Sequence, residues 1–472
     1  MTMHCFSPAA SCGSALDPTI LPSRIVRAAV VVLLICGAPL PGAQEDPDEP
    51  PPAEQLPSDV EVVLDRDVAT RLNLAVPRSG RPPEAGPEFL DAMNEVEQTL
   101  REDLAFTQLF DVQGPEVLSA VRLTGERAED LEQYRAYGNA VALLTEFKLN
   151  GDELILEGRV YDLASGQFIL GKRFNGGIDL ARRFAHAMSD EVVLYFTGRR
   201  GIAMTAIAFV SDRESQGSKE IFLMDYDGHA QRRITGHIST SLSPVWARDG
   251  SGLVYLSYFE GRPGVYWADL VTGRKTAIVA EEQPAYSPSL CPDGETLLVA
   301  RRTSNMELFA VSRSGGSPRQ LTRSSRIDTN PECSPDGTRV AFTSERSGTP
   351  QIYLMGIDGT DLQRVTFEGR YNEGASWHPD GSRLVYSRRA DRGDRHDIAV
   401  VDLVTGQDQL LTTGPGSHEN PSFSPNGEWI AFDTRRPGGR RHIYIMSQDG
   451  RYTRQVTSRG NNSHPSWSGY FD

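Results

Sequence analysis

The chain has 472 residues, of which 39% are hydrophobic and 24% are charged, an ordinary composition for a soluble protein with a sizeable core. Its formal net charge of −15 excludes generic binding to nucleic acid, because phosphate backbones require a basic protein surface. The 44 glycines and 30 prolines are spread along the chain, which favours many tight turns and therefore β structure.

The N-terminus has the pattern of a secretory signal. Arg24 and Arg27 precede a short apolar run at 28–36, and small residues follow it. The run is too short to cross a bilayer as a helix, so this arrangement predicts a cleaved signal peptide over 1–43. Acylation of Cys36 is an alternative, but an isoleucine precedes that cysteine where lipoprotein signals carry a small residue. The stretch before Arg24 also fits a translation start that has been assigned too far upstream.

The next part of the chain predicts a linker and a small α/β domain. Segment 44–59 is acidic and proline-rich, and we expect it to be extended and mobile because it has nothing to bury. The domain is expected at 60–199. Apolar residues recur at helical spacing over 88–104 and 179–198, and the second helix ends at a glycine. Between the helices, 153–174 alternates as two strands joined by a tight turn.

Beyond residue 202 the helical period disappears and a repeat of about 44 residues begins. Each unit contains a short strand, a turn that often reads Pro-Asp-Gly, and three further strand-like runs. Proline fixes φ at the start of such a turn, and glycine tolerates positive φ at its end. The copies align on one anchor residue at the end of the first strand, and five of the six anchors have a proline two places earlier. The anchors are Trp246, Leu290, Cys333, Trp377, Phe423 and Trp467.

Four strands per unit and this period are typical of a propeller blade, whose sheet buries its faces against its neighbours. The three-strand pattern occurs six times, but its first copy, which begins at Ala206, lacks the innermost strand. The missing strand stands alone at the C-terminus, at 463–469. The sequence therefore predicts a multi-domain chain: an N-terminal α/β domain at 60–199, followed at 202–472 by an all-β, six-bladed propeller with WD40-like repeats.

Two cysteines remain after the predicted signal peptide. Cys291 and Cys333 occupy nearly equivalent positions on the innermost strands of neighbouring blades. An exported protein with two cysteines suggests a disulfide, but different strands favour two separate, buried thiols. We therefore expect free thiols.

The loops that lead into the innermost strands, which we call the axial loops, converge near the propeller axis and are rich in polar residues. They lie on the same face as the loops between the second and third strands of each blade, which is the face where propellers usually bind. Any single residue could simply bond its own turn, but the converging set is the best candidate for a partner-binding face. The candidates are Asp328, Thr329, Asn330, Tyr371, Asn372, Glu373, His418, Glu419, Asn420, Asn462 and His464.

Two loops between second and third strands carry an excess of arginine. In a protein of negative net charge, such loops give one rim a positive potential that could steer an acidic partner. The plain alternative is that they are soluble loop tips. The arginines are Arg388, Arg389, Arg392, Arg395, Arg435, Arg436, Arg440 and Arg441.

Metal binding and catalysis find little support in the sequence. His237, His418 and His464, with Glu419 as an oxygen ligand, could hold a transition metal, but their different offsets from the anchors place them at different depths. The motif at 225–228 resembles the start of a calcium loop without its remaining ligands. The sequence also lacks serine-hydrolase, phosphate-loop, dinucleotide and zinc-peptidase motifs. We therefore predict no cofactor, no metal and no enzymatic activity.

Several stretches resemble the TolB family of the Tol-Pal system. They are RRFAHAMSDEVVLYFTGRRGIAMTAIAFVSDR at the domain junction, VYDLASGQFILGKRF in the first domain, and IFLMDYDG, IYLMGIDG and SPDGTRVAFTS in the blades. The resemblance covers about 60–472. It implies a TolB-like propeller in a periplasmic protein that is not an enzyme.

The same resemblance implies partners. Members of the family bind the peptidoglycan-associated lipoprotein Pal through the loop-rich face of the propeller, and contact the inner-membrane protein TolA through the N-terminal region. A Pal-like lipoprotein is therefore the expected partner of the candidate face, a TolA-like protein that of the N-terminal region, and other outer-membrane proteins are further candidates. The implied role is in outer-membrane integrity and cell division.

Two other functions stay open. Similar propellers act as lyases of acidic oligosaccharides, with a metal and basic residues that stabilise a carboxylate-bearing substrate; the three histidines and the arginine loops would supply these groups. A scaffold propeller with another envelope partner is the second alternative.

Overall fold

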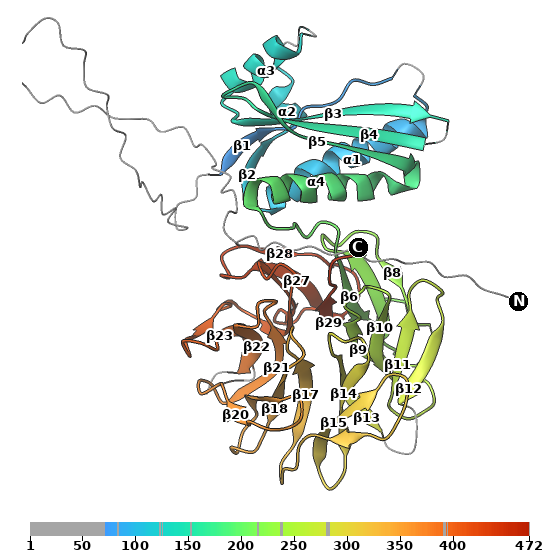
Figure 1. The fold of residues 1–472 in the computed structure, drawn as a ribbon, viewed down its shortest axis with the longest axis vertical. Helices are drawn as coiled ribbons and strands as arrows, with labels where there is room; N and C mark the ends of the chain where they lie inside the picture. Colours follow the sequence, from blue (N-terminus) through green and yellow to red (C-terminus); the bar gives the residue numbers. More distant parts are fainter. Residues whose placement is uncertain are drawn as a thin grey trace, which may run out of the picture. The chain divides into compact units, whose positions relative to one another are not determined.

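The computed structural model describes residues 71–471, except for 83–84, 122–123, 125, 152, 215–216, 237–238, 280–283, 390–392 and 394. The predicted signal peptide and the acidic segment 44–59 lie outside the described residues. The described chain forms an α/β domain followed by a six-bladed β-propeller, so the predicted fold class is confirmed (Figure 1). Within the described ranges, no helix has both the length and the apolar character that a membrane span requires.

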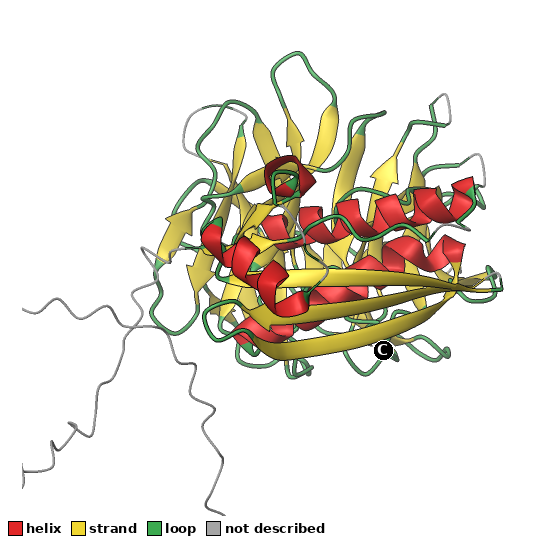
Figure 2. Cartoon of the chain, turned by 90° about the horizontal axis from the view of Figure 1, so that it is seen from above, coloured by secondary structure: helices red, strands yellow, loops and turns green. Residues whose placement is uncertain are grey.

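The α/β domain is built on one sheet with strand order β2-β1-β3-β4-β5. The first three of these strands are parallel neighbours, whereas β3, β4 and β5 are antiparallel. Helices α1 and α4 cover one face of the sheet, and α2 and α3 pack against the other (Figure 1). All helices of the described chain belong to this domain (Figure 2). The elements are β1 (Leu72–Ala75), α1 (Pro87–Phe106), β2 (Phe110–Gln113), α2 (Pro115–Leu118), α3 (Arg127–Ala136), β3 (Val141–Asn150), β4 (Glu153–Asp162), β5 (Gln167–Gly177), the short 3-10 turn η2 (Ile178–Leu180) and α4 (Ala181–Thr197).

Both predicted amphipathic helices are confirmed, as α1 and α4. Helix α1 begins at Pro87, whose missing N–H costs nothing in the first turn, and Glu88 favours the positive end of the helix dipole. Helix α4 ends at Gly198, whose φ of +68° is left-handed and costs glycine little. Leu100 of α1 and Met188 of α4 are fully buried in the core between the two helices and the sheet.

The propeller consists of six four-stranded antiparallel sheets, whose strands are named in order from the axis outward. Blade 1 contains β29 (Asn462–Trp467), β6 (Ala206–Ser211), β7 (Glu220–Asp225) and β8 (Arg232–Arg233). Blade 2 contains β9 (Ser241–Trp246), β10 (Gly252–Ser257), β11 (Gly264–Asp269) and β12 (Lys275–Val279). Blade 3 contains β13 (Ala285–Leu290), β14 (Thr296–Arg302), β15 (Met306–Ser312) and β16 (Arg319–Gln320).

The other three blades follow the same order. Blade 4 contains β17 (Asp328–Cys333), β18 (Arg339–Ser344), β19 (Gln351–Gly356) and β20 (Gln363–Arg364). Blade 5 contains β21 (Tyr371–Trp377), β22 (Arg383–Arg389), β23 (His396–Asp402) and β24 (Asp408–Leu410). Blade 6 contains β25 (Ser417–Phe423), β26 (Trp429–Arg435), β27 (Arg441–Ser447) and β28 (Thr453–Gln455).

The predicted closure of the ring is confirmed. The C-terminal strand β29 pairs with β6, the first strand of the propeller sequence, so that Trp467 lies opposite Ile207 and Asn462 opposite Ser211. Each innermost strand also contacts the innermost strands of both neighbouring blades. The two ends of the propeller sequence therefore share one sheet.

The innermost strands share a bulge that the sequence analysis did not predict. In each of them the ladder shifts register around the position that usually carries proline, two places ahead of the anchor. The residue just before that position has a left-handed φ between +46° and +62°, which is uncommon outside glycine. These residues are Ser243, Ser287, Asn330, Gly374, Asn420 and His464.

The α/β domain meets the propeller at blades 1 and 6. Phe106, the last residue of α1, stacks on Trp429 with ring centroids 4.2 Å apart, and the rings of Tyr226 and Tyr452 meet its edge. Phe106 is 3% exposed and belongs to the same apolar cluster as these propeller residues. The domains are therefore joined through a shared core.

A buried charged network adjoins this core. Asp103 of α1 accepts hydrogen bonds from Tyr226 Oη at 2.8 Å and from His186 Nδ1 of α4 at 2.8 Å. Arg182, one turn before His186, donates to Asp227 in the turn after β7. Burial alone would lower the pKa of His186, but its contacts with carboxylates outweigh burial and raise the pKa to about 10. His186 is therefore cationic at neutral pH.

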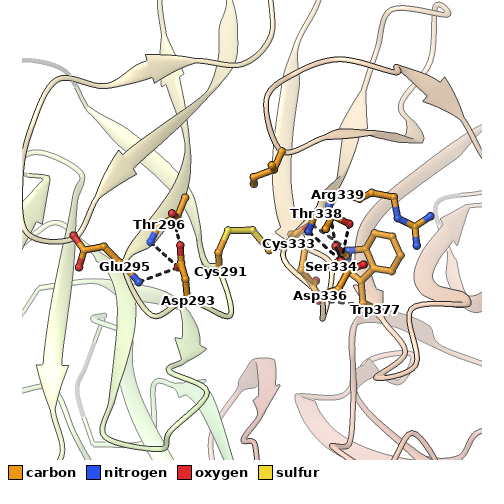
Figure 3. The surroundings of a disulfide bond; sticks show 12 residues. Cys291, Asp293, Glu295, Thr296, Cys333, Ser334, Asp336, Thr338, Arg339 and Trp377 are labelled. Carbon is orange, nitrogen blue, oxygen red and sulfur yellow. Dashed lines mark hydrogen bonds between the residues drawn. A yellow bond between two sulfur atoms is a disulfide. The ribbon is translucent and has the colours of Figure 1, made fainter.

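The prediction of two free thiols is wrong. Cys291 and Cys333 form a disulfide between blades 3 and 4, with their Cα atoms 5.2 Å apart (Figure 3). The expectation assumed that residues on different strands stay apart. Innermost strands of neighbouring blades instead converge on the axis, so nearly equivalent positions at their ends become close neighbours. The sulfurs lie in an apolar cluster with Leu298 and Val340, and both cysteines are buried.

Candidate functional site

The two ends of the propeller differ in what covers them. The six innermost strands surround the central channel of the propeller. Each of them runs from its axial loop to the turn that follows its anchor, so the axial loops lie at one end of this channel and the turns lie at the other. The α/β domain contacts the second end, at Tyr226, Asp227, Trp429 and Tyr452. The axial-loop end is thus the end that the α/β domain does not occupy.

All eleven candidate residues of the axial loops are described, and they fall into two groups. The first group is buried and stands at one repeated position, five places before the anchor. Asp328 accepts from Ser344 and Arg346, for example, and pairs with Arg346 at 2.9 Å. Such bonds fix the start of each innermost strand, which is a structural role. The group consists of Asp328, Asn372, His418 and Asn462.

The second group is half-buried and stands at the bulges or within three residues before them. Thr329 and Asn330 of blade 4 reach Ser287 at the bulge of blade 3, with oxygen–oxygen distances of 3.2 and 2.9 Å. Side chains of blades 3 and 4 thus meet at this end of the axis. The group consists of Thr329, Asn330, Tyr371, Glu373, Glu419, Asn420 and His464.

One charged cluster ties blade 6 to blade 1. Asp433 is fully buried and accepts from Arg441, from Asn420 Nδ2 at 2.8 Å and from the backbone N–H of His464 at 2.9 Å. Burial raises the pKa of Asp433 to about 6, although Arg441 counteracts it. Arg441 also donates to Glu419 at 2.9 Å. Burial alone would raise the pKa of that carboxyl, but its hydrogen bonds with Arg441 and a neighbouring serine outweigh burial and lower the pKa.

Blade 5 adds an aromatic and acidic pair. Tyr371 Oη donates to Glu373 Oε2 at 3.0 Å, and Arg389 lies over the tyrosine ring at 4.8 Å. Burial raises the pKa of Glu373. His396 meets the edge of Tyr371 and brings its Nδ1 within 3.8 Å of Glu419. This half-buried, polar surface offers carboxylate acceptors and an aromatic ring to a partner.

The candidate metal ligands do not form a site in the described part of the chain. His237 lies outside the described residues. One ion can be shared by three side chains whose ligand atoms all lie within 4.8 Å of one another. The ligand atoms of His418, Glu419 and His464 do not meet this condition. Burial lowers the pKa of His418, and lowers that of His464 to about 4, so both rings are neutral at pH 7.

A different trio, Asp103, His186 and Asp227, does meet that distance at the domain junction. Arg182 already pairs with Asp227, and His186 is itself a cation there. The trio is therefore an ion-pair network whose carboxylates are neutralised by side chains.

The arginines of the predicted rim differ in their burial and in their ion pairs. Arg388 is buried and pairs with Asp408, and Arg441 is held by Asp433 and Glu419, so these charges are largely compensated. Arg395 is exposed but bonds Asp397, and Arg392 lies outside the described residues. Arg389 covers Tyr371. The other exposed arginines of the predicted rim are Arg435, the last residue of β26, and Arg436 and Arg440 in the loop between β26 and β27.

The end of the channel opposite the axial loops holds a cavity of about 1120 Å³ that sequence reasoning missed. Trp246, Trp377 and Trp467 line it, together with the repeated prolines and the two cysteines. Its signal was present in the sequence, because these are the anchors and the prolines two places before them. In the sequence they mark only the repeat, and the fold gathers them around one cavity.

Comparison with known proteins agrees with this architecture. The family model described as "TolB beta propeller domain" matches residues 194–471. A "Tol-Pal system protein TolB" of Bordetella pertussis is 38% identical over 301 residues, covering 63% of this chain and 67% of that protein. A "Protein TolB homolog" of Chlorobium luteolum is 29% identical over 409 residues, covering 86% and 92%. The match to a homolog of Chlorobium chlorochromatii, at 33% identity, spans about half of each chain, 52% and 56%. The crystal structure of TolB from Acinetobacter baumannii superposes with a TM-score of 0.72 at 26% identity, covering 85% of this chain and 97% of that one.

Proposed function

This chain belongs to the TolB family, and on this basis we propose that it works in the periplasm, in a Tol-Pal system, as a binding protein rather than an enzyme. In this proposal it binds a Pal-like lipoprotein with the axial-loop end of its propeller and a TolA-like protein with its N-terminal region. It thereby supports outer-membrane integrity and cell division.

The observation that carries the proposal is the position of the half-buried polar group. It lies at the end of the propeller away from the α/β domain, where a partner could reach it without displacing that domain. The Cys291–Cys333 disulfide also supports an extracytoplasmic location, because disulfides persist in oxidising compartments. The predicted signal peptide points the same way.

Partner binding is tested by removing side chains from the half-buried group only. We expect the combination Tyr371→Ala, Glu373→Ala and Asn420→Gly to weaken binding of a Pal-like lipoprotein by at least about 30-fold, the effect of losing one hot spot. Glycine at 420 keeps the left-handed backbone, whose φ is +54°. The measurement is capture from a detergent-solubilised envelope extract with residues 44–472 as bait, followed by titration with the captured protein.

A matched control carries Val271→Ser and Val404→Ser, which alter two valines that are 87% and 83% exposed in turns at the other end of the propeller. It should bind like the unaltered chain. If the lipoprotein is not captured, or if all three baits bind it equally, the proposed partner or the proposed face is wrong. Metal analysis and assays on acidic oligosaccharides would then test the lyase alternative.

The second partner is tested by shortening the bait. Within the N-terminal region, we place the TolA-like contact in the part that precedes residue 71. A bait of residues 71–472 lacks this part, so it should capture the lipoprotein and lose the TolA-like protein. Equal recovery of the TolA-like protein by both baits would contradict this assignment. Loss of both partners would instead indicate a folding defect, which the melting temperature of the short bait reveals.

A further inference from the structure

The disulfide between Cys291 and Cys333 is a feature that the proposed binding role does not explain. Cys333 is the last residue of β17, and Cys291 directly follows β13, so the bond joins the innermost strands of blades 3 and 4 (Figure 3). The cysteines are 4% and 7% exposed, and both line the channel cavity. Their immediate surroundings are apolar.

The place of this bond in the ring gives it a mechanical role. The blades follow one another around the axis, so the junction of blades 3 and 4 lies across the ring from the junction of blades 6 and 1. Next to the latter, β29 closes the ring by hydrogen bonding to β6. The disulfide therefore clamps the side of the ring that the terminal strands do not hold.

The burial of both sulfurs limits when the bond can form. A protein oxidant must contact a cysteine thiolate directly, because thiol–disulfide exchange passes through a mixed disulfide. At 4% and 7% exposure, the assembled blades leave little room for such a contact. Oxidation by a protein therefore has to precede the final docking of blade 3 on blade 4.

We propose that this chain is a substrate of a thiol oxidase of the envelope, a protein that carries a reactive disulfide, and that oxidation of Cys291 and Cys333 is a step in the folding of the propeller. One cysteine thiolate attacks the oxidase disulfide and forms a mixed disulfide. The thiolate of the other cysteine then displaces the oxidase, which leaves as a dithiol with two electrons and two protons from the substrate. The inference rests on the periplasmic location proposed above, but not on either partner.

The number of cysteines in the exported chain indicates that folding does not need a disulfide isomerase. Cys5, Cys12 and Cys36 lie in the predicted signal peptide, so the exported chain keeps two cysteines, separated by 42 positions. Two cysteines allow a single pairing, and no wrong intramolecular bond can form. Folding should depend on an oxidase and be independent of a disulfide isomerase.

The experiment follows the full chain, residues 1–472, in the envelope of bacteria that lack either the thiol oxidase or the disulfide isomerase, beside their parent. Cells are quenched with acid, and thiols are then labelled under denaturing conditions with a maleimide polymer that retards each labelled chain on a gel. A doubly substituted chain, Cys291→Ala and Cys333→Ala, serves as the control, because its yield should be the same in all three strains.

In parent cells we expect an unlabelled mature chain that gains two labels only after reduction. Without the oxidase, both thiols should label and the yield of protease-resistant chain should fall, whereas loss of the isomerase should change nothing. Free thiols in the folded chain from parent cells would overturn the proposal, and so would full oxidation without the oxidase or a requirement for the isomerase. If the control chain does not accumulate, the labelling of the unaltered chain decides alone. Retention of an uncleaved chain in the cytosol would overturn this proposal together with the periplasmic location, whereas failure to capture a Pal-like lipoprotein would leave it standing.

Discussion

A chain that ends after Gly460 is expected not to form a stable propeller. The truncation removes β29, which supplies the innermost strand of blade 1 and pairs with β6. Trp467 alone is 6% exposed and donates its indole N–H to Thr205 Oγ1 at 2.9 Å. Loss of a buried tryptophan side chain costs about 3–5 kcal/mol, a large part of the roughly 5–15 kcal/mol that stabilises a typical domain. Removal of the whole strand should exceed that reserve.

The measurement is the cooperative thermal transition together with limited proteolysis of the purified chain. Trp467→Phe serves as a graded control, since it keeps most of the apolar contact and removes the hydrogen bond to Thr205, at a cost of about 1 kcal/mol. A truncated chain with an unchanged melting temperature would show that the remaining strands of blade 1 close the ring by themselves.

The second large effect is expected at the domain junction. His186→Gln should lower the free energy of unfolding by about 3–5 kcal/mol, because it removes one partner of a buried ion pair and leaves the carboxylate of Asp103 undercompensated. His186 and Asp103 are 4% and 2% exposed. The loss should appear first as weaker docking of the α/β domain on the propeller, seen as faster proteolysis near Gly201.

The control is a more exposed ion pair, which also involves a residue of helix α4. Lys172 and Glu191 lie 2.8 Å apart with side chains 40% and 34% exposed, so Glu191→Gln should cost no more than about 1 kcal/mol. Equal effects of the two substitutions would contradict the importance of burial at the junction.

The pH dependence gives a second test of His186. Its pKa is about 10 in the folded chain and ordinarily 6.5, so the folded state binds the proton more tightly. Its contribution to stability is therefore complete below pH 6.5 and is lost as the pH rises towards 10. The difference in unfolding free energy between the unaltered chain and His186→Gln should shrink over that range in denaturant titrations. Burial raises the pKa of nearby Asp190 to about 6, below this window, so that group does not account for such a trend.

Much of the fold could be predicted from the sequence, because the signals are local. Alternation of apolar residues, Asp-Gly turns and a period of about 44 residues specify strands and their order. Blade 1 follows from a three-strand copy that lacks its innermost strand at the start of the propeller region and a single strand at its end. Helical spacing likewise predicted α1 and α4. These features depend on neighbours within a few residues, or on counting repeats.

The candidate face was predicted only as a set. Asp328 and Thr329 are adjacent in sequence, yet the first is buried and the second half-buried, because a strand alternates its faces and the bulge then changes their direction. Nothing in the local pattern marked which residue would adopt the left-handed conformation. The division into a structural group and an accessible group therefore required the structure.

The blades, their number and the closure of the ring follow from the order of residues alone, since hydrophobic patterning and turn chemistry are written along the chain. The folded molecule was needed to reveal that Cys291 meets Cys333, that Arg441 is held by Asp433 and Glu419, and that His186 is kept as a cation by Asp103. These three pairings have one cause in common. They depend on distances of a few ångströms between separate strands or helices, which only the packed structure sets. The disulfide joins the innermost strands of blades 3 and 4, the Arg441 contacts join three strands of blade 6, and the pair of His186 and Asp103 joins helices α4 and α1.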